Sequence, residues 1–121
     1  MEIQAKLKSL TPKQCDSMLR SVDDALYIIG GKWKLKIIIA LTTCKRFNEI
    51  QRQIKGVSAR LLSKELKELE MNGFVKRIIF ADANPVRVEY ELTEYSDILE
   101  PVVIALKNFG RMHKEKIVQK S

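Results

Sequence analysis

The apolar positions of this chain follow two different periods. Apolar residues recur three and four apart, the spacing of one helix face, over residues 32–42, 47–54, 58–71 and 93–118. A further helix, or pair of helices, is predicted from Thr11-Pro12 to about Ile29, because a capping residue followed by proline often starts a helix. Between residues 74 and 92 the period changes to two, which predicts strands 74–81 and 86–92 joined by a turn at 82–85.

Single residues refine the ends of these elements. Ser58 is expected to cap the helix 58–71 by accepting a hydrogen bond from a free N–H of its first turn. Gly56 is expected to close the preceding helix, and Pro101 either kinks the last helix or marks its first turn. Trp33 lies on the apolar side of the helix 32–42, which predicts a core position for its ring.

The order of the elements predicts a fold. Three helices, a hairpin and a long last helix are the order of a winged helix-turn-helix, mainly α with a small β-hairpin (an α+β fold). We expect a single domain of residues 1–121, with residues 1–10 frayed and dimerisation helices at both ends. In a helix-turn-helix pair the second helix enters the DNA major groove, and here that helix is 58–71.

The charges of the helix 58–71 support that role. Leucines form one side of it, whereas Arg60, Lys64 and Lys67 stand on the other, and neighbouring like charges favour a bound anion. The whole chain carries a net charge of +7. Residues 31–55 contain seven basic residues against the single acid Glu49, a net +6, which suits a polyanion, although a solvated lysine face remains the alternative.

Several function classes find little support in the sequence. The longest apolar run, Ile37 to Leu41, is too short to cross a bilayer, and the N-terminus resembles no secretory signal, so we expect a protein of the cytoplasm. Two cysteines without CxxC spacing and one histidine, His113, indicate no metal site. With no glycine-rich loop and no nucleophile-base pattern, neither an enzyme nor a bound cofactor is expected.

The chain also resembles a known family. IGGKWKLKIIIAL (29–41), RFNEIQRQIKGVSARLLSKELKELEMNGFVKR (46–77) and PVRVEYELTEYSDILEPV (85–102) are similar to the HxlR-type transcriptional regulators, relatives of the MarR winged-helix proteins. The resemblance covers about Val22 to Gly110. It implies a bacterial or archaeal homodimer, associated with the nucleoid, that binds double-stranded DNA at inverted repeats, with 58–71 as recognition helix and 82–85 as wing.

Two sets of site residues follow. Side chains on the outer side of 58–71, before the preceding helix and beside the wing are expected to contact DNA: Ser58, Ala59, Arg60, Ser63, Lys64, Lys67, Arg46 and Arg87. The apolar side of the last helix, which the resemblance pairs across a two-fold axis, is expected to form the dimer seam: Leu99, Val102, Val103, Leu106, Phe109 and His113.

Other readings stay open at this point. The fold also serves for protein contacts, and several members of the family sense oxidants through a cysteine about ten residues before the paired glycines. Arg20 holds that place here, and Cys15 lies five residues earlier. Cys15 and Cys44 are therefore candidates for a redox role, with buried inert thiols as the alternative. An unidentified small-molecule effector could bind between the core and the last helix.

Overall fold

The computed structural model describes residues 7–120, and of Lys120 only the backbone. The chain separates into two compact units, residues 1–31 and residues 32–121. The expectation that residues 1–10 fray falls mostly on residues 1–6, which lie outside the part described. No helix within residues 7–120 is long and apolar enough to span a membrane.

The first unit consists mainly of one helix, α2 (Pro12–Ile29). Thr11 accepts a hydrogen bond from the backbone N–H of Gln14 at 3.2 Å, and the Gln14 side chain accepts one from the N–H of Thr11 at 2.9 Å. This reciprocal pair is a capping box, and it confirms the predicted start of the helix. The helix is continuous to Ile29 and buries none of its side chains within the chain.

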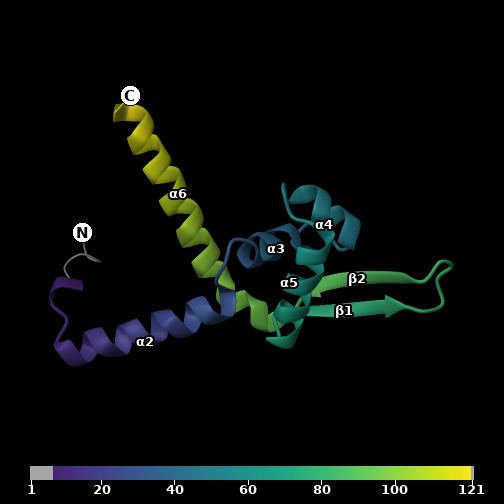
Figure 1. The fold of residues 1–121 in the computed structure, drawn as a ribbon, viewed down its shortest axis with the longest axis horizontal. Helices are drawn as coiled ribbons and strands as arrows, with labels where there is room; N and C mark the ends of the chain where they lie inside the picture. Colours follow the sequence, from purple (N-terminus) through teal and green to yellow (C-terminus); the bar gives the residue numbers. More distant parts are fainter. Residues whose placement is uncertain (1–6, 121) are drawn as a thin grey trace. The chain divides into compact units, whose positions relative to one another are not determined.

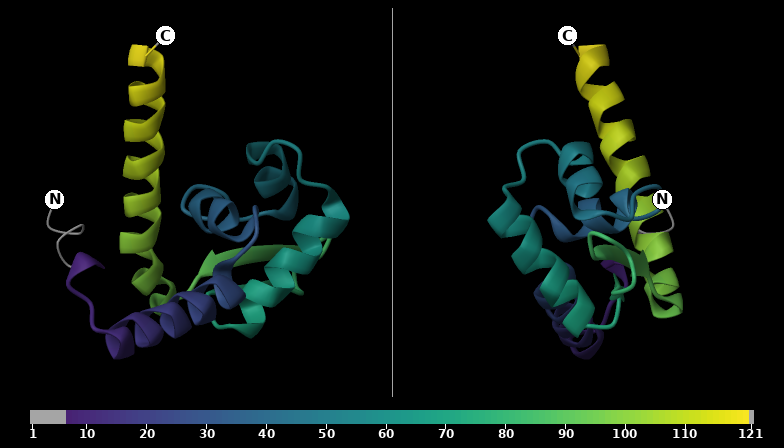
Figure 2. Two further views of the ribbon diagram at one scale, coloured as in Figure 1. Left: turned by 60° about the vertical axis from the view of Figure 1, so that its left-hand side comes forward. Right: turned by 90° about the vertical axis from the view of Figure 1, so that its right-hand side faces the viewer.

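The second unit contains all the predicted elements of the helix-turn-helix. Helix α3 (Lys34–Ala40) is followed by α4 (Phe47–Gln53) and α5 (Ala59–Met71). Strands β1 (Val75–Phe80) and β2 (Arg87–Leu92) then form a hairpin, and the 3-10 helix η1 (Glu94–Leu99) leads into α6 (Glu100–Lys120). Figure 2 shows α3, α4 and α5 grouped together, with α5 at the outer edge of the group.

The core of the second unit is built where these helices meet the base of the hairpin. Its fully buried side chains come from each helix and from β1: Ile37, Ile50, Leu62, Leu66, Leu69 and Val75. The five helical residues among them are at the spacing that the sequence assigns to the core, whereas Val75 is the first residue of β1. Burial of aliphatic side chains on this scale is the main force that holds α5 against α3 and α4.

The hairpin is antiparallel, with Val75 opposite Leu92 and Phe80 opposite Arg87. Beyond that last pair the wing loop projects away from the three helices (Figure 1). The backbone N–H of Tyr90 also donates to the carbonyl of Lys45 at 2.7 Å. The segment before α4 therefore lies against β2 and joins the hairpin to the helix-turn-helix.

The structure corrects three details of the prediction. The last helix is not continuous from residue 93, because Thr93 caps η1 and α6 begins only at Glu100, which places Pro101 in its first turn. Helix α3 begins at Lys34 rather than at residue 32. Trp33 is half-buried rather than a core residue, and it is the N-cap residue that precedes the first turn of α3.

Candidate nucleic-acid interface

Helix α5 presents a basic surface opposite its buried leucines. Leu62, Leu66 and Leu69 are at most 1% exposed. The predicted contact residues on the other sides are all exposed: Ser58, Ala59, Arg60, Ser63, Lys64 and Lys67. Among residues 7–120 no ion pair involves Arg60, Lys64 or Lys67, so none of these side chains is held directly against a carboxylate.

The start of α5 is fixed by its cap and by the turn before it. The backbone N–H of Leu61 donates to the Ser58 hydroxyl at 3.1 Å, which confirms the predicted cap. Gly56 has a φ of +88°, a conformation that L side chains rarely adopt, and this glycine reverses the chain after α4. Val57 is buried. The turn at residues 55–57 thus sets how the basic side of α5 is directed.

A buried ion pair anchors α5 to α3, and the sequence alone suggested otherwise. The Lys34 ammonium lies 2.5 Å from a carboxylate oxygen of Glu65 and 3.2 Å from one of Glu68. The side chains of Lys34 and Glu65 are each only 11% exposed. Glu65, which reads from the sequence as a solvated residue, is a core contact, and Lys34 is not available to a polyanion.

The signal for this contact was present in the sequence. Glu65 lies three residues after Leu62 and one before Leu66, so it falls on the apolar side of α5. Burial alone would lower the pKa of Lys34, but the hydrogen bonds and charges of Glu65 and Glu68 outweigh it and raise that pKa. The hydrogen bond from Lys34 lowers the pKa of Glu68, so both partners stay ionised at neutral pH.

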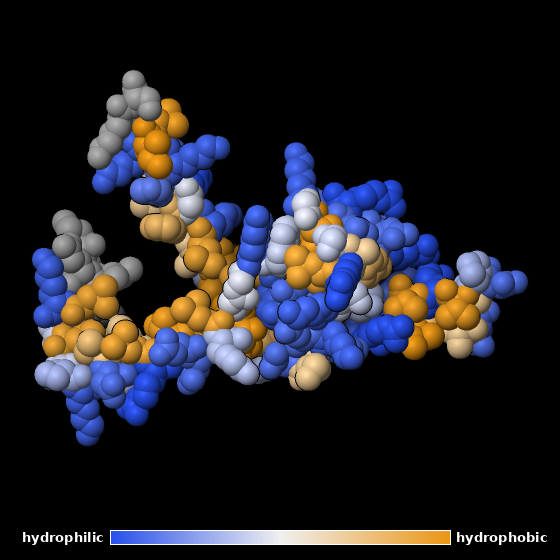
Figure 3. Space-filling model, in the orientation of Figure 1, coloured by the Kyte–Doolittle hydropathy of each residue, from blue (hydrophilic) through white to orange (hydrophobic). Residues whose placement is uncertain are grey.

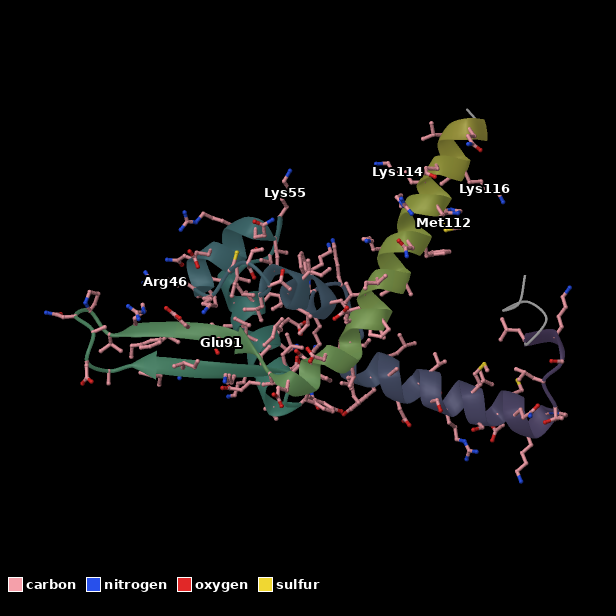
Figure 4. The ribbon with its side chains drawn as sticks, turned by 180° about the vertical axis from the view of Figure 1, so that it is seen from behind. Arg46, Lys55, Glu91, Met112, Lys114 and Lys116 are labelled. Carbon is pink, nitrogen blue, oxygen red and sulfur yellow. The ribbon has the colours of Figure 1, made fainter. Side chains whose placement is uncertain are left out.

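The Arg46 side chain, at the start of α4, forms no ion pair within residues 7–120. The backbone N–H groups of Arg46 and Lys45 donate to a Glu49 carboxylate oxygen at 3.0 and 3.3 Å, and these bonds lower the pKa of Glu49. The carboxylate of Glu49 is therefore used in capping the helix. Figure 4 shows the Arg46 side chain on the same side of the fold as the hairpin, and the side chain is exposed.

Arg87 lies against the wing strands rather than extending from them. Its Nε is 2.9 Å from a Glu89 carboxylate oxygen, and its guanidinium carbon lies 4.2 Å from the centre of the Phe80 ring. The side chain is 37% exposed. The Phe80 side chain is half-buried beneath this guanidinium. A DNA contact by Arg87 would have to be made from this folded-back position or by release from it.

The predicted dimer seam is exposed except at one end. Val102, Leu106, Phe109 and His113 are exposed on α6, and Val103 is half-buried. Phe109 stacks on His113 with ring centres 6.0 Å apart. Leu99 is only 5% exposed, because it ends η1 and packs into the core of its own chain, so it is not available to a second subunit.

Hydrophobic side chains also gather along α2, and Figure 3 shows apolar surface on both α2 and α6. On α2 the exposed apolar residues include Met18, Leu19, Val22 and Leu26. Cys15, on the same helix, is exposed, and Cys44 is half-buried after α3. Neither thiol is therefore the fully buried hydrophobe that is typical of an inert cysteine.

The space expected between the core and the last helix is present. A hollow of about 320 Å³ is lined mainly by apolar side chains of α3, β2 and α6, with Ser96, Asp97 and Glu100 at its edge. Within residues 7–120 no group of three or more His, Cys, Asp or Glu side chains is arranged to hold a metal ion. Exposed basic side chains of this unit include Arg60, Lys64 and Lys67 on the outer side of α5.

Comparison with known proteins agrees with this geometry. A family model described as HxlR-like helix-turn-helix matches residues 28–118. The chain is 39% identical over 97 residues to YdeP of Bacillus subtilis, an uncharacterized HTH-type transcriptional regulator, covering 79% of this chain and 75% of that protein.

Two solved structures show the same fold. That of the HTH-type transcriptional regulator ytcD is 38% identical and superposes with a TM-score of 0.72, covering 78% of this chain and 96% of that one. That of the redox regulator HypR in its reduced form is 36% identical, with a TM-score of 0.73, covering 82% and 98%.

Proposed function

This chain belongs to the HxlR-like helix-turn-helix family of transcriptional regulators, and from that premise we propose that it binds double-stranded DNA as a homodimer and reads an inverted-repeat operator with α5. One observation carries the proposal. Helix α5 is fixed from behind by three buried leucines and by Lys34, while Arg60, Lys64 and Lys67 face solvent without ion-pair partners among residues 7–120. Helix α5 has 13 residues. An α-helix with its side chains is about 10–12 Å in diameter, which fits the B-DNA major groove, about 12 Å wide.

The contacts divide into two kinds. Arg60 and Ser63, near the start of α5, are in position to reach base edges, because recognition helices contact bases through their N-terminal residues. Arg46, before α4, and the wing at 82–85, which projects away from the three helices, would contact the phosphates. The wing loop contributes shape and backbone contacts, since Arg87 is held by Glu89 and Phe80.

The homodimer rests on the apolar residues that each unit leaves exposed. Leu106 and Phe109 are 51% and 67% exposed on α6, and α2 buries none of its side chains. Exposed apolar surface of this kind marks a protein interface. A second copy of the chain would supply the matching surface and a second α5. Two recognition helices require half-sites about one turn of DNA apart, or a multiple of it.

The test of the DNA interface is substitution on α5. A duplex selected from a random pool is titrated with the parent, Arg60→Ala and Lys64→Ala, with binding followed by fluorescence anisotropy. Removal of a base contact costs about 1 to 3 kcal/mol and changes the sequence preference, whereas removal of a phosphate contact weakens all duplexes alike. We expect Arg60→Ala to behave in the first way and Lys64→Ala in the second.

A matched control removes the same charge elsewhere. Lys116 on α6 projects into solvent (Figure 4), so Lys116→Ala should bind the selected duplex nearly as the parent does. If Arg60→Ala and Lys64→Ala both bound as tightly as the parent, α5 would not be the reading helix. If no duplex were enriched at all, the DNA-binding function itself would be wrong.

We propose no redox function on the likeness to HypR. The chain has Arg20 where the family resemblance places a sensing cysteine. Cys15 lies in the first unit and Cys44 in the second, so each unit has a single thiol.

A further inference from the structure

Four basic residues gather around the helix-turn-helix turn, outside the contact surface of α5. Lys32 and Lys36 flank Trp33, Arg52 is on α4, and Lys55 begins the turn; we call these four residues the turn cluster. Lys32, Lys36, Arg52 and Lys55 are all exposed. Within residues 7–120 no ion pair involves any of them, which distinguishes them from Lys34 in the same stretch.

Trp33 contacts both Lys32 and Lys36 and lies next to Gly56 of the turn. The ammonium groups of Lys32 and Lys36 lie 5.1 and 5.2 Å from the centre of the Trp33 ring. The edge of that ring lies against Gly56, so close that a Cβ added there would be 3.8 Å from it. The two ammonium groups are thus held within about a Debye length (~10 Å at 0.1 M salt) of each other, where like charges are not fully screened.

Two hollows continue the cluster across the turn. The first is lined by Lys36 and Lys55 together with Thr42, Thr43 and Gln53, and its remaining lining is apolar. The second is lined by Arg52 and Lys55 with Asn48 and Gln51. Neither lining contains a carboxylate. Cations with neutral hydrogen-bonding side chains and no acid are the groups that bind a phosphate oxygen.

The position of the turn indicates that the phosphate groups in question are those of the DNA backbone. Residues 55–57 lead directly into Ser58, the cap of α5, so the cluster lies at the end of the helix proposed to enter the groove. Arg46 and Lys55 stand at opposite ends of α4 (Figure 4). The major groove is about 12 Å wide and is bordered by a phosphate strand on each side. Arg46 and Lys55, at the two ends of α4, would therefore contact DNA phosphates next to the bases that α5 contacts.

We propose that the turn cluster binds the DNA phosphate backbone beside the groove that α5 enters, extending the interface beyond the recognition helix and the wing. The inference rests on the proposed function, because it names a further contact of the same protein with the same partner. Lys34, between Lys32 and Lys36 in sequence, takes no part, since Glu65 and Glu68 hold its ammonium group.

The main test is the salt dependence of binding. Lys36→Gln with Lys55→Gln removes two positive charges from the cluster, and Lys114→Gln with Lys116→Gln on α6 is the matched control. The affinity for the selected duplex and for an unrelated duplex of the same length is measured between 50 and 200 mM salt. The magnitude of the slope of log K against log salt should fall by about 1 for each phosphate that the variant no longer binds.

We expect a fall of between 1 and 2 for the cluster variant on both duplexes, and no change for the control. Equal slopes for the cluster variant, the control and the parent would overturn the proposal. If Arg60→Ala still weakened binding in that case, the DNA-binding function would stand without the cluster. Failure of every variant and of the parent to bind would refute both together.

A second test uses Trp33, the only tryptophan of the chain, as a local reporter. Iodide, an anion, should quench Trp33 fluorescence more strongly in the parent than in Lys32→Gln with Lys36→Gln, whereas neutral acrylamide should quench both alike. Bound duplex should protect Trp33 from iodide. In a further experiment, inorganic phosphate is added at constant ionic strength and the iodide quenching of Trp33 fluorescence is measured again. If phosphate alone protected Trp33 and DNA did not, the cluster would be a site for a free anion instead.

Discussion

At the scale of single residues, Lys34 and Glu65 show what spacing can and cannot predict. The sequence places Glu65 at the spacing of the leucines of α5, but its charge among lysines favours a solvated residue, and the structure buries it. The sequence does not show that Lys34, 31 residues earlier, supplies the partner, because that requires α3 and α5 to pack side by side. A carboxylate buried without such a partner would cost several kcal/mol. The pair therefore fixes which side of α5 faces the core.

We expect Lys34→Met to destabilise the protein by about 3 kcal/mol, because it leaves the Glu65 carboxylate buried and unpaired. Urea unfolding measures this as a lower midpoint at an unchanged slope. The double variant Lys34→Met with Glu65→Leu is the control, and it should recover most of the loss. Glu68 is 40% exposed, so its share of the effect is small. A Lys34→Met protein as stable as the parent would contradict a stabilising role for the pair.

The same contact gives the stability a pH dependence. The folded pKa of Glu68 is lowered, so its contribution is present above its unfolded pKa, about 4.3, and is lost as pH falls through the folded value. The folded pKa of Lys34 is raised, so its contribution is complete below about pH 10.4 and is lost as pH rises beyond. Between these limits the ion pair is fully formed.

At the scale of elements, the start of α5 was predicted correctly and its neighbourhood was not. Ser58, four residues before the buried Leu62, is a local signal, because a cap needs only the backbone of its own first turn. Two contacts join segments far apart in sequence: the hydrogen bond from the Tyr90 N–H to the Lys45 carbonyl, and the packing of the Trp33 ring near Gly56. No local periodicity encodes them, so Trp33 was assigned to the core.

Removing the cap tests how much it stabilises α5. Ser58→Ala deletes the acceptor for the Leu61 N–H and should cost about 1 kcal/mol of stability. Ser63→Ala, at an exposed position inside the same helix, is the matched control. It should be neutral or slightly stabilising, because alanine has the higher helix propensity. Thermal unfolding without DNA measures both variants, and equal loss in the two would show that the cap hydrogen bond contributes nothing.

At the scale of the whole molecule, the proposed dimer decides whether two reading helices act together. Helix α2 of the first unit buries none of its side chains. The apolar pattern of the last helix predicts an interface. It does not show which of its apolar residues pack into the core of the same chain and which are left for a second subunit. The structure makes that distinction at Leu99, which its own chain buries, and at Leu106 and Phe109, which it leaves exposed.

We expect Leu106→Asp and Phe109→Asp each to shift the protein from dimer to monomer, because each would bury an unpaired charge in an apolar seam. Lys107→Asp, at the exposed neighbouring position, introduces the same side chain and should leave the dimer intact. Sedimentation velocity at micromolar concentration measures the change. A parent protein that is monomeric there would remove the dimer, and with it the expectation of paired half-sites.

Patterns along the chain were enough to predict the order of the elements, the cap of α5, the apolar and basic sides of that helix and the likeness to HxlR-type regulators. Each of these depends on residues within a few positions of one another, where helix and strand geometry fix the neighbours. The three-dimensional structure was needed to show that Lys34 is ion-paired, whereas Lys32 and Lys36 lie over the Trp33 ring and form no ion pair among residues 7–120. It also showed that Arg87 folds back onto Phe80 and that Leu99 belongs to the core. These outcomes depend on which distant elements pack together, and the periodicity of the sequence does not show this.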